Sequence, residues 1–422
     1  MGMLFSCQSD PVAETIEPTE TTSPPNILLI IADDMGKDAT SGFDEGSDKP
    51  TTPHIDSIRN SGLTFTNFWA YPTCSPSRAS IITGKYGYRT GVKWADDVMS
   101  SSETILHRYI TEQTDSAYAT ALIGKWHLSG PKSTQNPEDL GMDYFAGIMN
   151  GAVPDYYNWR LAENGQESKQ TEYATEKITD LSINWINEQE KPWFLWLAYN
   201  APHTPFHVPP AEMHSQGDLP DYTEDAEPLP YYLAAIEAMD YQIGRLLENL
   251  SEEELANTVI IFLGDNGTPN QVAQHPFTRM TVKGTLYQGG VNTPMFISGP
   301  GISRVGEADD NLITGTDLFA TISEIAGASI SEINDSKSFK SLLTAPAIHR
   351  DFQYSEMNKG DGDSWAINDG QYKLITDVNG NEEMYNLSDD PYEKTNLQSG
   401  TLDSDQQTAK SNLENELSKI RD

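Results

Sequence analysis

A cysteine followed closely by an arginine is the part of this sequence best suited to chemistry. Residues 74–84 read CSPSRASIITG, in which a short helix is expected to begin at Pro76 or the residue after it and to end at Gly84. Cys74 is therefore expected just ahead of a helix N-terminus, where free N–H groups and the helix dipole favour an anion. Arg78 adds a planar cation that suits a tetrahedral oxyanion. The stretch predicts a nucleophile over an anion pocket, with an unreactive free cysteine as the alternative.

Two polar pairs each follow an apolar run of strand length. Asp33 and Asp34 follow the run NILLIIA, and Asp265 and Asn266 follow the run TVIIFLG. Such runs are typical of parallel strands that are buried on both faces. Carboxylate and amide oxygens, with no thiolate or imidazole among them, select Ca²⁺ or Mg²⁺ over zinc. The pairs predict a metal site at the carboxyl ends of two strands, although acidic residues there also serve simply as turn formers.

Cationic and imidazole side chains follow other predicted elements. Lys125 and His127 belong to the segment GKWH at a strand end, and are expected on one side of it because they are two residues apart. His203 stands between prolines after another apolar strand, and Lys283 lies in the segment VKGT. With Arg78, these groups would place several cations around one site, as a transition state with spreading negative charge requires. A lone histidine between prolines is equally often a structural turn residue.

Strands and helices alternate along most of the chain. Besides the two runs above, strands are expected at 63–69, 117–123, 193–199 and 293–298, and helices at 53–60, 103–111, 177–190, 231–250 and 317–325. The alternation predicts an open α/β sheet with helices on both faces and ligands at the carboxyl ends of its strands. Short strands at 352–357, 364–368 and 372–376 and a helix at 404–420 predict a small antiparallel subdomain. The predicted parts are a linker (1–25), an α/β catalytic domain (26–345) and a C-terminal subdomain (346–422).

The segment Cys74-x-Pro-x-Arg, followed by Thr83 and Gly84, resembles the signature of the formylglycine-dependent (type I) sulfatases of the alkaline phosphatase superfamily. The resemblance implies an alkaline-phosphatase-like fold: a large mixed, mostly parallel sheet sandwiched by helices, with a small C-terminal antiparallel α+β subdomain. It also implies that Cys74 is oxidised to Cα-formylglycine (3-oxoalanine) by a formylglycine-generating enzyme or an anaerobic maturase. The implied metal is one Ca²⁺, and its implied ligands are Asp33, Asp34, Asp265, Asn266 and the modified Cys74.

The same resemblance implies a role for each of the other groups. The formylglycine hydrate would attack the sulfur of a sulfate ester while Ca²⁺ and Arg78 stabilise it. Lys125 and Lys283 would hold sulfuryl oxygens, and His203, together with Lys283, would protonate the leaving alcohol. His127 would then take a proton from the remaining hydroxyl, which expels sulfate and regenerates the aldehyde.

The leaving-group pocket is not fixed by these motifs. Candidates to contact the substrate lie in neighbouring segments: Tyr88, Trp94, Tyr156, Trp159, His275 and Arg279. Aromatic rings pack on sugar faces, but they pack equally well in an ordinary loop. These rings and the composition favour a sulfated carbohydrate or oligosaccharide over a small aryl or alkyl sulfate as substrate.

Composition limits the partners and suggests a location. The chain has 63 Asp and Glu residues against 27 Lys and Arg residues, and a net charge of −36. This argues against nucleic acids and anionic membranes as partners, and suits a salty, marine habitat. The segment LFSC resembles a bacterial lipobox ending at Cys7, which predicts an extracytoplasmic lipoprotein, periplasmic or on the outer surface. A lipid anchor at Cys7 is the one predicted membrane contact. The alternatives to a lipidated Cys7 are that the N-terminus is artificial or that Cys7 forms a disulfide with Cys74.

Two other functions fit the same motifs. The first is a phosphonate or phosphodiester hydrolase of the same superfamily, since some of its members also use formylglycine. The second is a lipoprotein that keeps the fold and binds sulfated glycans without turning them over. The first alternative would prefer a phosphonate or phosphodiester to a sulfate ester. In the second alternative, Cys74 would remain unmodified.

Overall fold

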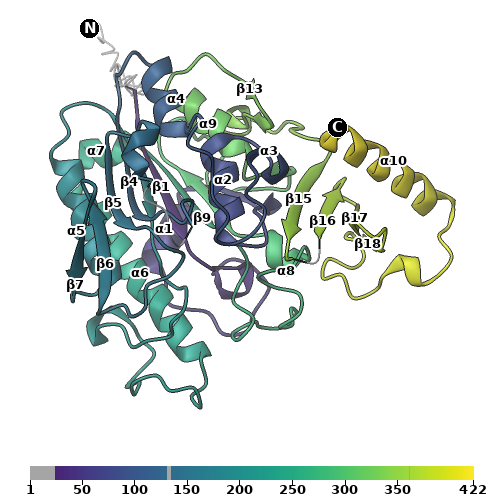
Figure 1. Cartoon of the computed structure of the whole chain (residues 1–422), viewed down its shortest axis with the longest axis horizontal. Helices are drawn as coiled ribbons and strands as arrows, with labels where there is room; N and C mark the ends of the chain where they lie inside the picture. The colour runs from purple at the N-terminus through teal and green to yellow at the C-terminus, as the bar shows by residue number, and fades with distance from the viewer. Residues whose placement is uncertain (1–23, 131–134, 361) are drawn as a thin grey trace, which may run out of the picture.

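The computed structural model describes residues 24–130, 135–360 and 362–422, so Cys7 and the predicted linker lie outside it. A ten-stranded sheet runs through the larger part of the molecule, and a four-stranded sheet with one helix forms the smaller part that carries the C-terminus (Figure 1). Among the described residues, no helix is both long enough and apolar enough to cross a membrane.

The centre of the large sheet is parallel. Strand β1 (Asn26–Ala32) lies between β8 (Trp193–Ala198) and β9 (Thr258–Gly264), and β4 (Ala119–Lys125) and β5 (Tyr144–Ile148) follow on the β8 side. Beyond β9, β10 (Met295–Ser298) and β2 (Gly62–Phe65) pair antiparallel, and β11 (Ala308–Asp309) closes that edge. At the other edge, β6 (Trp159–Glu163) and β7 (Gln166–Gln170) form an antiparallel hairpin. Strands β1, β4, β8 and β9 are buried along their whole length, which explains their continuous apolar sequences.

Helices cover both faces of this sheet, as the alternating pattern predicts. Alternate side chains of β1 enter two separate apolar clusters, one on each face. One cluster is shared with α2 (Cys74–Thr83), α4 (Leu106–Gln113) and α9 (Asp317–Ile325). The other is shared with α1 (Pro53–Asn60), α5 (Ala174–Asn187) and α6 (Leu229–Asn249). The strands are thereby fixed from both sides, and their carboxyl ends are held in register.

The smaller part contains an antiparallel sheet, as predicted, and its strands lie in chain order. Its strands are β15 (Gln353–Asn358), β16 (Asp363–Asn368), β17 (Tyr372–Asp377) and β18 (Glu382–Asn386). Helix α10 (Ser404–Arg421) packs its apolar residues, among them Leu413 and Leu417, against this sheet. Lys373 of β17 connects it to the larger part, because its ammonium group lies over the Trp69 ring and donates to the Leu286 carbonyl oxygen (2.5 Å).

The remaining elements are short. They are α3 (Gly87–Thr90), α7 (Glu252–Ala256), α8 (Gln288–Val291), β3 (Phe68–Trp69), β12 (Ile313–Thr314), β13 (Glu332–Ile333), β14 (Ser336–Lys337) and the 3₁₀ turns Lys37–Ala39, Pro137–Leu140, Ala211–Met213, Lys340–Leu343 and Leu397–Ser399.

The structure corrects three predictions of local structure. The strand expected at 63–69 is two strands in different sheets, β2 and β3. Strands β5, β6, β7 and β18 are additional to the predicted ones, and β7 in particular reads QESKQ, which has no apolar alternation to reveal it. Cys74 is the first residue of α2 rather than the residue ahead of it, with Thr73 as the N-cap. Pro76 is tolerated within the first turn because an N–H there has no intrahelical partner to lose.

Gly84 ends α2 in the left-handed conformation, with φ +65°, and a Cβ there would lie 3.0 Å from Phe319. A non-glycine residue in the left-handed conformation costs roughly 1–2 kcal/mol. We expect Gly84→Ala to lower the free energy of unfolding by more than this, because its Cβ would also contact Phe319. Gly91 is the matched control, because its φ is +76° and no atom lies within 4 Å of its Cβ position. Chemical denaturation of both variants measures the difference, and an equal loss in the two would contradict the packing argument.

Candidate active site

The predicted catalytic and metal-binding residues meet at the carboxyl ends of the central strands. Asp33 and Asp34 follow β1, Lys125 ends β4, and Asp265 and Asn266 follow β9. His203 follows β8, and the first turn of α2 brings Cys74 and Arg78. Strand ends that are far apart in sequence lie side by side in a parallel sheet, so the topology assembles the group.

Hydrogen bonds join the acidic residues into one buried cluster. The Asp34 N–H donates to Asp265 Oδ1 (3.1 Å), and Asn266 Nδ2 donates to Asp34 Oδ1 (2.8 Å). Ligand atoms of Asp33, Asp265 and Cys74 all lie within 4.8 Å of one another. Asp34 has φ +68°, a left-handed conformation that aspartate tolerates better than most residues. The Tyr232 hydroxyl of α6 holds this turn by donating to the Asp34 carbonyl oxygen (2.7 Å).

Each cation of the site contacts one of these carboxylates. Arg78 donates from Nε (3.0 Å) and Nη2 (2.7 Å) to Asp265 Oδ2, and from Nη1 to the Lys125 carbonyl oxygen (2.8 Å). Lys125 Nζ lies 2.6 Å from Asp33 Oδ2, and Lys283 Nζ lies 2.5 Å from the Asp34 carboxylate. Because these groups are largely withdrawn from water, their charges interact far more strongly than surface ion pairs do.

Two oxygens of the cluster fit a divalent cation. Asp33 Oδ1 and Asn266 Oδ1 are buried and accept no hydrogen bond from the part of the chain that the structure describes. Burial raises the pKa of Asp33 to about 7 although Lys125 opposes the shift, so this carboxylate lacks sufficient positive charge around it. Burial also disfavours charged Asp34, but Lys283, His203 and Lys125 outweigh it and hold the pKa of Asp34 well below its usual range. A hard cation bound here would satisfy both orphaned oxygens.

Burial keeps both the Cys74 thiol and the His203 imidazole in their neutral forms. Cys74 is 2% exposed, and burial raises the pKa of its thiol, so the unmodified side chain is a poor nucleophile. Burial lowers the pKa of His203 to about 3, against the opposing effect of Asp34, so this imidazole is neutral at pH 7. Its Nδ1 bonds to the Thr204 carbonyl oxygen (2.7 Å) and therefore carries the hydrogen.

His127 is oriented by a residue that sequence reasoning missed. It lies beyond the end of β4 with φ +57°, so the strand alternation that predicted one shared side with Lys125 does not extend to it. Its Nε2 lies 2.8 Å from Asp96 Oδ1, and the hydrogen bond from His127 keeps the pKa of Asp96 low. Since a carboxylate only accepts, Nε2 carries the hydrogen and the lone pair is on Nδ1, which is buried without a partner among the described residues.

The predicted substrate-contacting residues divide into three groups. Trp94 is half-buried, with its ring 3.6 Å from the Cβ position of Gly284, beside Lys283, and it remains a candidate wall of the site. His275 and Arg279 are exposed on the segment that leads to Lys283, and their roles stay predictions.

Tyr156 and Tyr88 need correction. The Tyr156 side chain is buried, because its hydroxyl donates to the carbonyl oxygens of Asn200 (2.8 Å) and His203 (2.7 Å). Trp159 begins β6 and is also largely buried, but it lines a hollow beside this strand, so its role stays a prediction. Tyr88 lies against α10, where its hydroxyl donates to the Ile420 carbonyl oxygen and its ring contacts Arg421.

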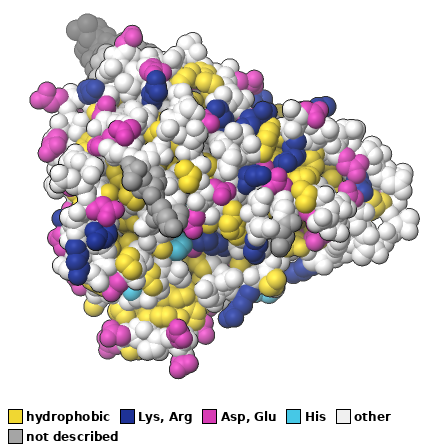
Figure 2. Space-filling view, in the orientation of Figure 1, with side chains coloured by type: hydrophobic (Ala, Val, Ile, Leu, Met, Phe, Trp, Pro, Cys, Tyr) yellow, Lys and Arg dark blue, Asp and Glu magenta, His cyan; other side chains and the backbone are white. Residues whose placement is uncertain are grey.

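Charge is distributed unevenly over the molecular surface. Figure 2 shows Lys and Arg side chains gathered with a histidine around the middle of one face, whereas many acidic side chains lie toward its outline. The chain as a whole carries a net charge of −36, so this local concentration of cations opposes the overall field. Such a centre suits an anionic ligand.

Comparison with known proteins agrees with this geometry. Residues 25–328 match the sulfatase family, and residues 279–422 match the family described as N-sulphoglucosamine sulphohydrolase, C-terminal. The chain belongs to the sulfatase family. It is 29% identical to the uncharacterized sulfatase YdeN of Escherichia coli (strain K12) over 74% of this chain and 65% of that protein. It is 28% identical to arylsulfatase G of Rattus norvegicus over 78% of this chain and 70% of that protein.

Solved structures share the fold. The Ps i-CgsB complex with k-i-k-neocarrahexaose superposes with a TM-score of 0.77 at 25% identity, covering 94% of this chain and 92% of that one. Phosphonate monoester hydrolase of Agrobacterium radiobacter superposes with a TM-score of 0.71 at 20% identity, covering 94% of this chain and 95% of that one. The alkaline-phosphatase-like fold predicted from the sequence is thereby confirmed.

Asp96→Asn tests the orientation of His127. An amide can present its oxygen or its nitrogen, so the buried imidazole loses its fixed tautomer and turnover of a sulfate ester should fall roughly 10–1000-fold. Burial lowers the pKa of His127 and Lys125 adds to this effect, while Asp96 opposes it. Removing the carboxylate should therefore lower this pKa further and move the acid limb of the pH–rate profile to lower pH.

Asp115→Asn is the control for this substitution, because Asp96 (φ +67°) and Asp115 (φ +51°) are both exposed aspartates with positive φ. The pH–rate profile and the ¹⁵N-histidine NMR titration of both variants give the comparison. An unchanged His127 resonance and unchanged turnover in Asp96→Asn would remove Asp96 from the site.

Proposed function

We propose that this chain hydrolyses a sulfate ester of a sulfated carbohydrate, with Cys74 converted to formylglycine and one Ca²⁺ bound beside it. The observation that carries the proposal is the convergence of cations and hard oxygen ligands on Cys74 in one buried cluster. The chain spans only about two thirds of the length of the curated relatives described above, so their activities support the proposal and do not decide it.

The two absent groups have defined places in the proposal. Formylglycine supplies, as its hydrate, an oxygen nucleophile toward sulfur, and Ca²⁺ supplies positive charge that stabilises this nucleophile. The residues that would hold the cation are Asp33, Asp34, Asp265 and Asn266, together with the modified residue 74. The two orphaned oxygens, Asp33 Oδ1 and Asn266 Oδ1, support this ligand set.

The side chains of the site account for the other requirements. Arg78 is fixed by Asp265 and by the Lys125 carbonyl oxygen, so it needs no reorganisation as charge develops at residue 74. Lys125 and Lys283 bring ammonium groups to the same cluster and can hold sulfuryl oxygens. Each holds its ammonium group against a carboxylate of the cluster, so the positive charge is in place before a substrate binds.

Proton transfer divides between the two histidines and Lys283. Burial opposes charge on Lys283, but Asp34 outweighs it and raises the pKa of Lys283, so this group carries a proton throughout. His203 becomes a donor to the leaving alcohol only when a bound anionic ester raises its pKa. His127 has its lone pair on Nδ1, which is the atom that would accept a proton when sulfate is expelled.

Carbohydrate as the substrate class rests on two supports. The Ps i-CgsB structure, at 25% identity, holds k-i-k-neocarrahexaose. In this chain, the half-buried ring of Trp94 beside Lys283 provides an aromatic surface of the kind that packs on sugar faces. A phosphonate monoester hydrolase shares the fold, so relative turnover of p-nitrophenyl sulfate and p-nitrophenyl phosphonate esters is the measurement that separates the two ester classes.

The first test is the mass of the tryptic peptide that contains Cys74, from protein co-expressed with a formylglycine-generating enzyme. We expect the aldehyde at residue 74, and hydrolysis of sulfated oligosaccharides that is lost in Cys74→Ala. A thiol that persists under these conditions, or hydrolysis that survives in Cys74→Ala, would refute the proposed nucleophile.

The metal is tested through stability rather than activity. Ca²⁺ should raise the Tm of the wild type by mass action, and EDTA should reverse the increase. Asn266→Ala removes one orphaned oxygen and should abolish most of this response. Asn266→Asp is the matched control, because it keeps an oxygen ligand while placing a second charge beside Asp34, and it should retain the response from a lower starting Tm. A larger shift with Mg²⁺ than with Ca²⁺ would change the assigned ion.

A further inference from the structure

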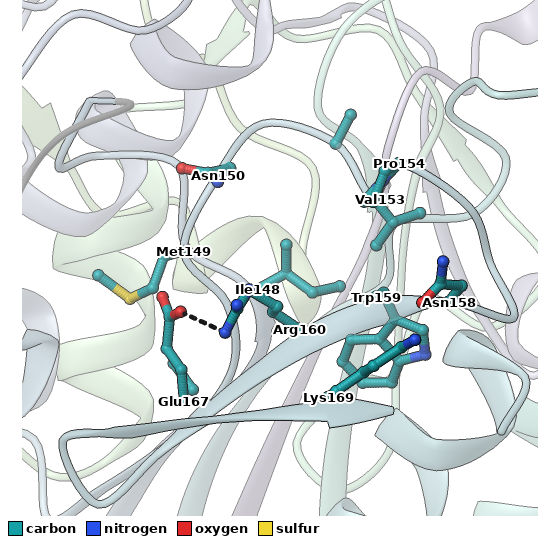
Figure 3. Close-up of a pocket in the computed structure, with 12 residues that line it drawn as sticks. Ile148, Met149, Asn150, Val153, Pro154, Asn158, Trp159, Arg160, Glu167 and Lys169 are labelled. Atoms are coloured by element: carbon teal, nitrogen blue, oxygen red, sulfur yellow. Dashed lines mark hydrogen bonds and ion pairs between the residues drawn. The ribbon is translucent and has the colours of Figure 1, made fainter. Parts of the chain in front are cut away.

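A hollow of about 670 Å³ opens next to the proposed active site. It lies between the segment that follows β5 and the β6–β7 hairpin at the edge of the large sheet (Figure 3). Its polar and aromatic lining residues are Asn150, Asn158, Trp159, Arg160, Glu167 and Lys169. None of them belongs to the cluster around Cys74, so the mechanism above leaves this hollow without a role.

The wall of the hollow also supports His127. The Trp126 N–H donates to the Ile148 carbonyl oxygen (2.9 Å), and the His127 N–H donates to the Met149 carbonyl oxygen (3.2 Å). A Cβ on Gly151 would lie 2.4 Å from the His127 ring, so backbone and imidazole are in close contact there. The backbone that lines the hollow at Met149 and Asn150 therefore also contacts His127, which places the hollow directly beside the site.

The hairpin places two cations opposite each other at this wall. Arg160 and Lys169 are cross-strand partners in the β6–β7 register, and both line the hollow. Like charges directly opposite each other destabilise a hairpin, so folding alone does not account for this pair. The pairing is also unexpected in a chain with only 27 Lys and Arg residues against 63 Asp and Glu residues.

Acidic side chains of the described residues neutralise Arg160 and Lys169 only in part. Arg160 Nη1 lies 3.3 Å from Glu167 Oε2, but the two side chains are 70% and 51% exposed, and such a pair contributes little. Lys169 forms no ion pair with a carboxylate among the described residues. Beneath them, Trp159 is fixed by its Nε1 hydrogen bond to the Glu172 carbonyl oxygen (3.0 Å), which gives the hollow a rigid floor.

We propose that this hollow binds an anionic substituent, a sulfate ester or a carboxylate, on the sugar next to the one that carries the ester to be cleaved. Arg160 and Lys169 bind the anion, and the side-chain amides of Asn150 and Asn158 bind hydroxyls of the same ring. The inference rests on the proposed function and narrows its substrate to a saccharide with at least two anionic groups.

The test compares three disaccharides of one backbone that share the ester to be cleaved: one with a neutral neighbouring ring, one with a second sulfate on it, and one with a uronate in its place. We expect the modified wild-type enzyme to have the higher kcat/KM on one or both dianionic substrates. Lys169→Met and Arg160→Gln should each lower that value about tenfold and leave the monosulfated substrate unchanged. Whichever dianion shows the loss identifies sulfate or carboxylate as the bound group.

Two further variants sharpen the result. Glu167→Gln removes the competing carboxylate from Arg160 and should increase the preference for the dianion. Lys191→Met removes one positive charge just ahead of β8, at the opposite end of that strand from the site. It should leave the preference for the dianionic substrates unchanged, because it alters only the overall charge of the protein.

Equal effects of Lys169→Met and Lys191→Met on all substrates, or no preference for a dianion in the wild type, would overturn the inference while hydrolysis itself continued. Absence of hydrolysis of every sulfate ester by enzyme with a verified aldehyde would instead refute the proposed function.

Discussion

The structure depends on keeping several charges buried at the ends of apolar strands. Asp265 is central to this balance, because one carboxylate oxygen accepts from Arg78 and the other from the Asp34 N–H. It thereby connects helix α2, the end of β1 and the end of β9. An isolated carboxylate at this depth would be protonated, and an isolated guanidinium would not be buried there. The cations and carboxylates therefore stabilise the site only as a set.

This set also reconciles the acidic chain with the anionic ligand that we propose for it. The overall charge repels a sulfated saccharide at a distance, but screening by salt confines that repulsion to short range. Close to the site, the ammonium and guanidinium groups dominate, and they are held in place before the ligand arrives. The acidic residues at the outline of the molecule can then serve solubility without weakening recognition.

Much of the fold and of the reactive centre could be predicted from sequence, because buried parallel strands and their polar ends leave a strong local pattern. The runs that became β1, β8 and β9 are apolar throughout, and each ends in residues of the site. The hairpin β6–β7 left no such pattern, since its exposed strand QESKQ is stabilised by pairing rather than by burial. Asp96 was equally hidden, because only the tertiary fold brings an exposed loop aspartate to His127.

Burial of Cys74 has a consequence for the timing of its proposed maturation. A residue that is 2% exposed in the finished fold is closed to a modifying enzyme, so the proposed oxidation must precede the closure of the site. That closure requires Asp265, which is synthesised 187 residues after Arg78, and at the usual rates of translation this interval lasts roughly 10–40 s. The long sequence separation of the two halves of the site thus gives the chain an interval in which Cys74 is translated but not yet enclosed.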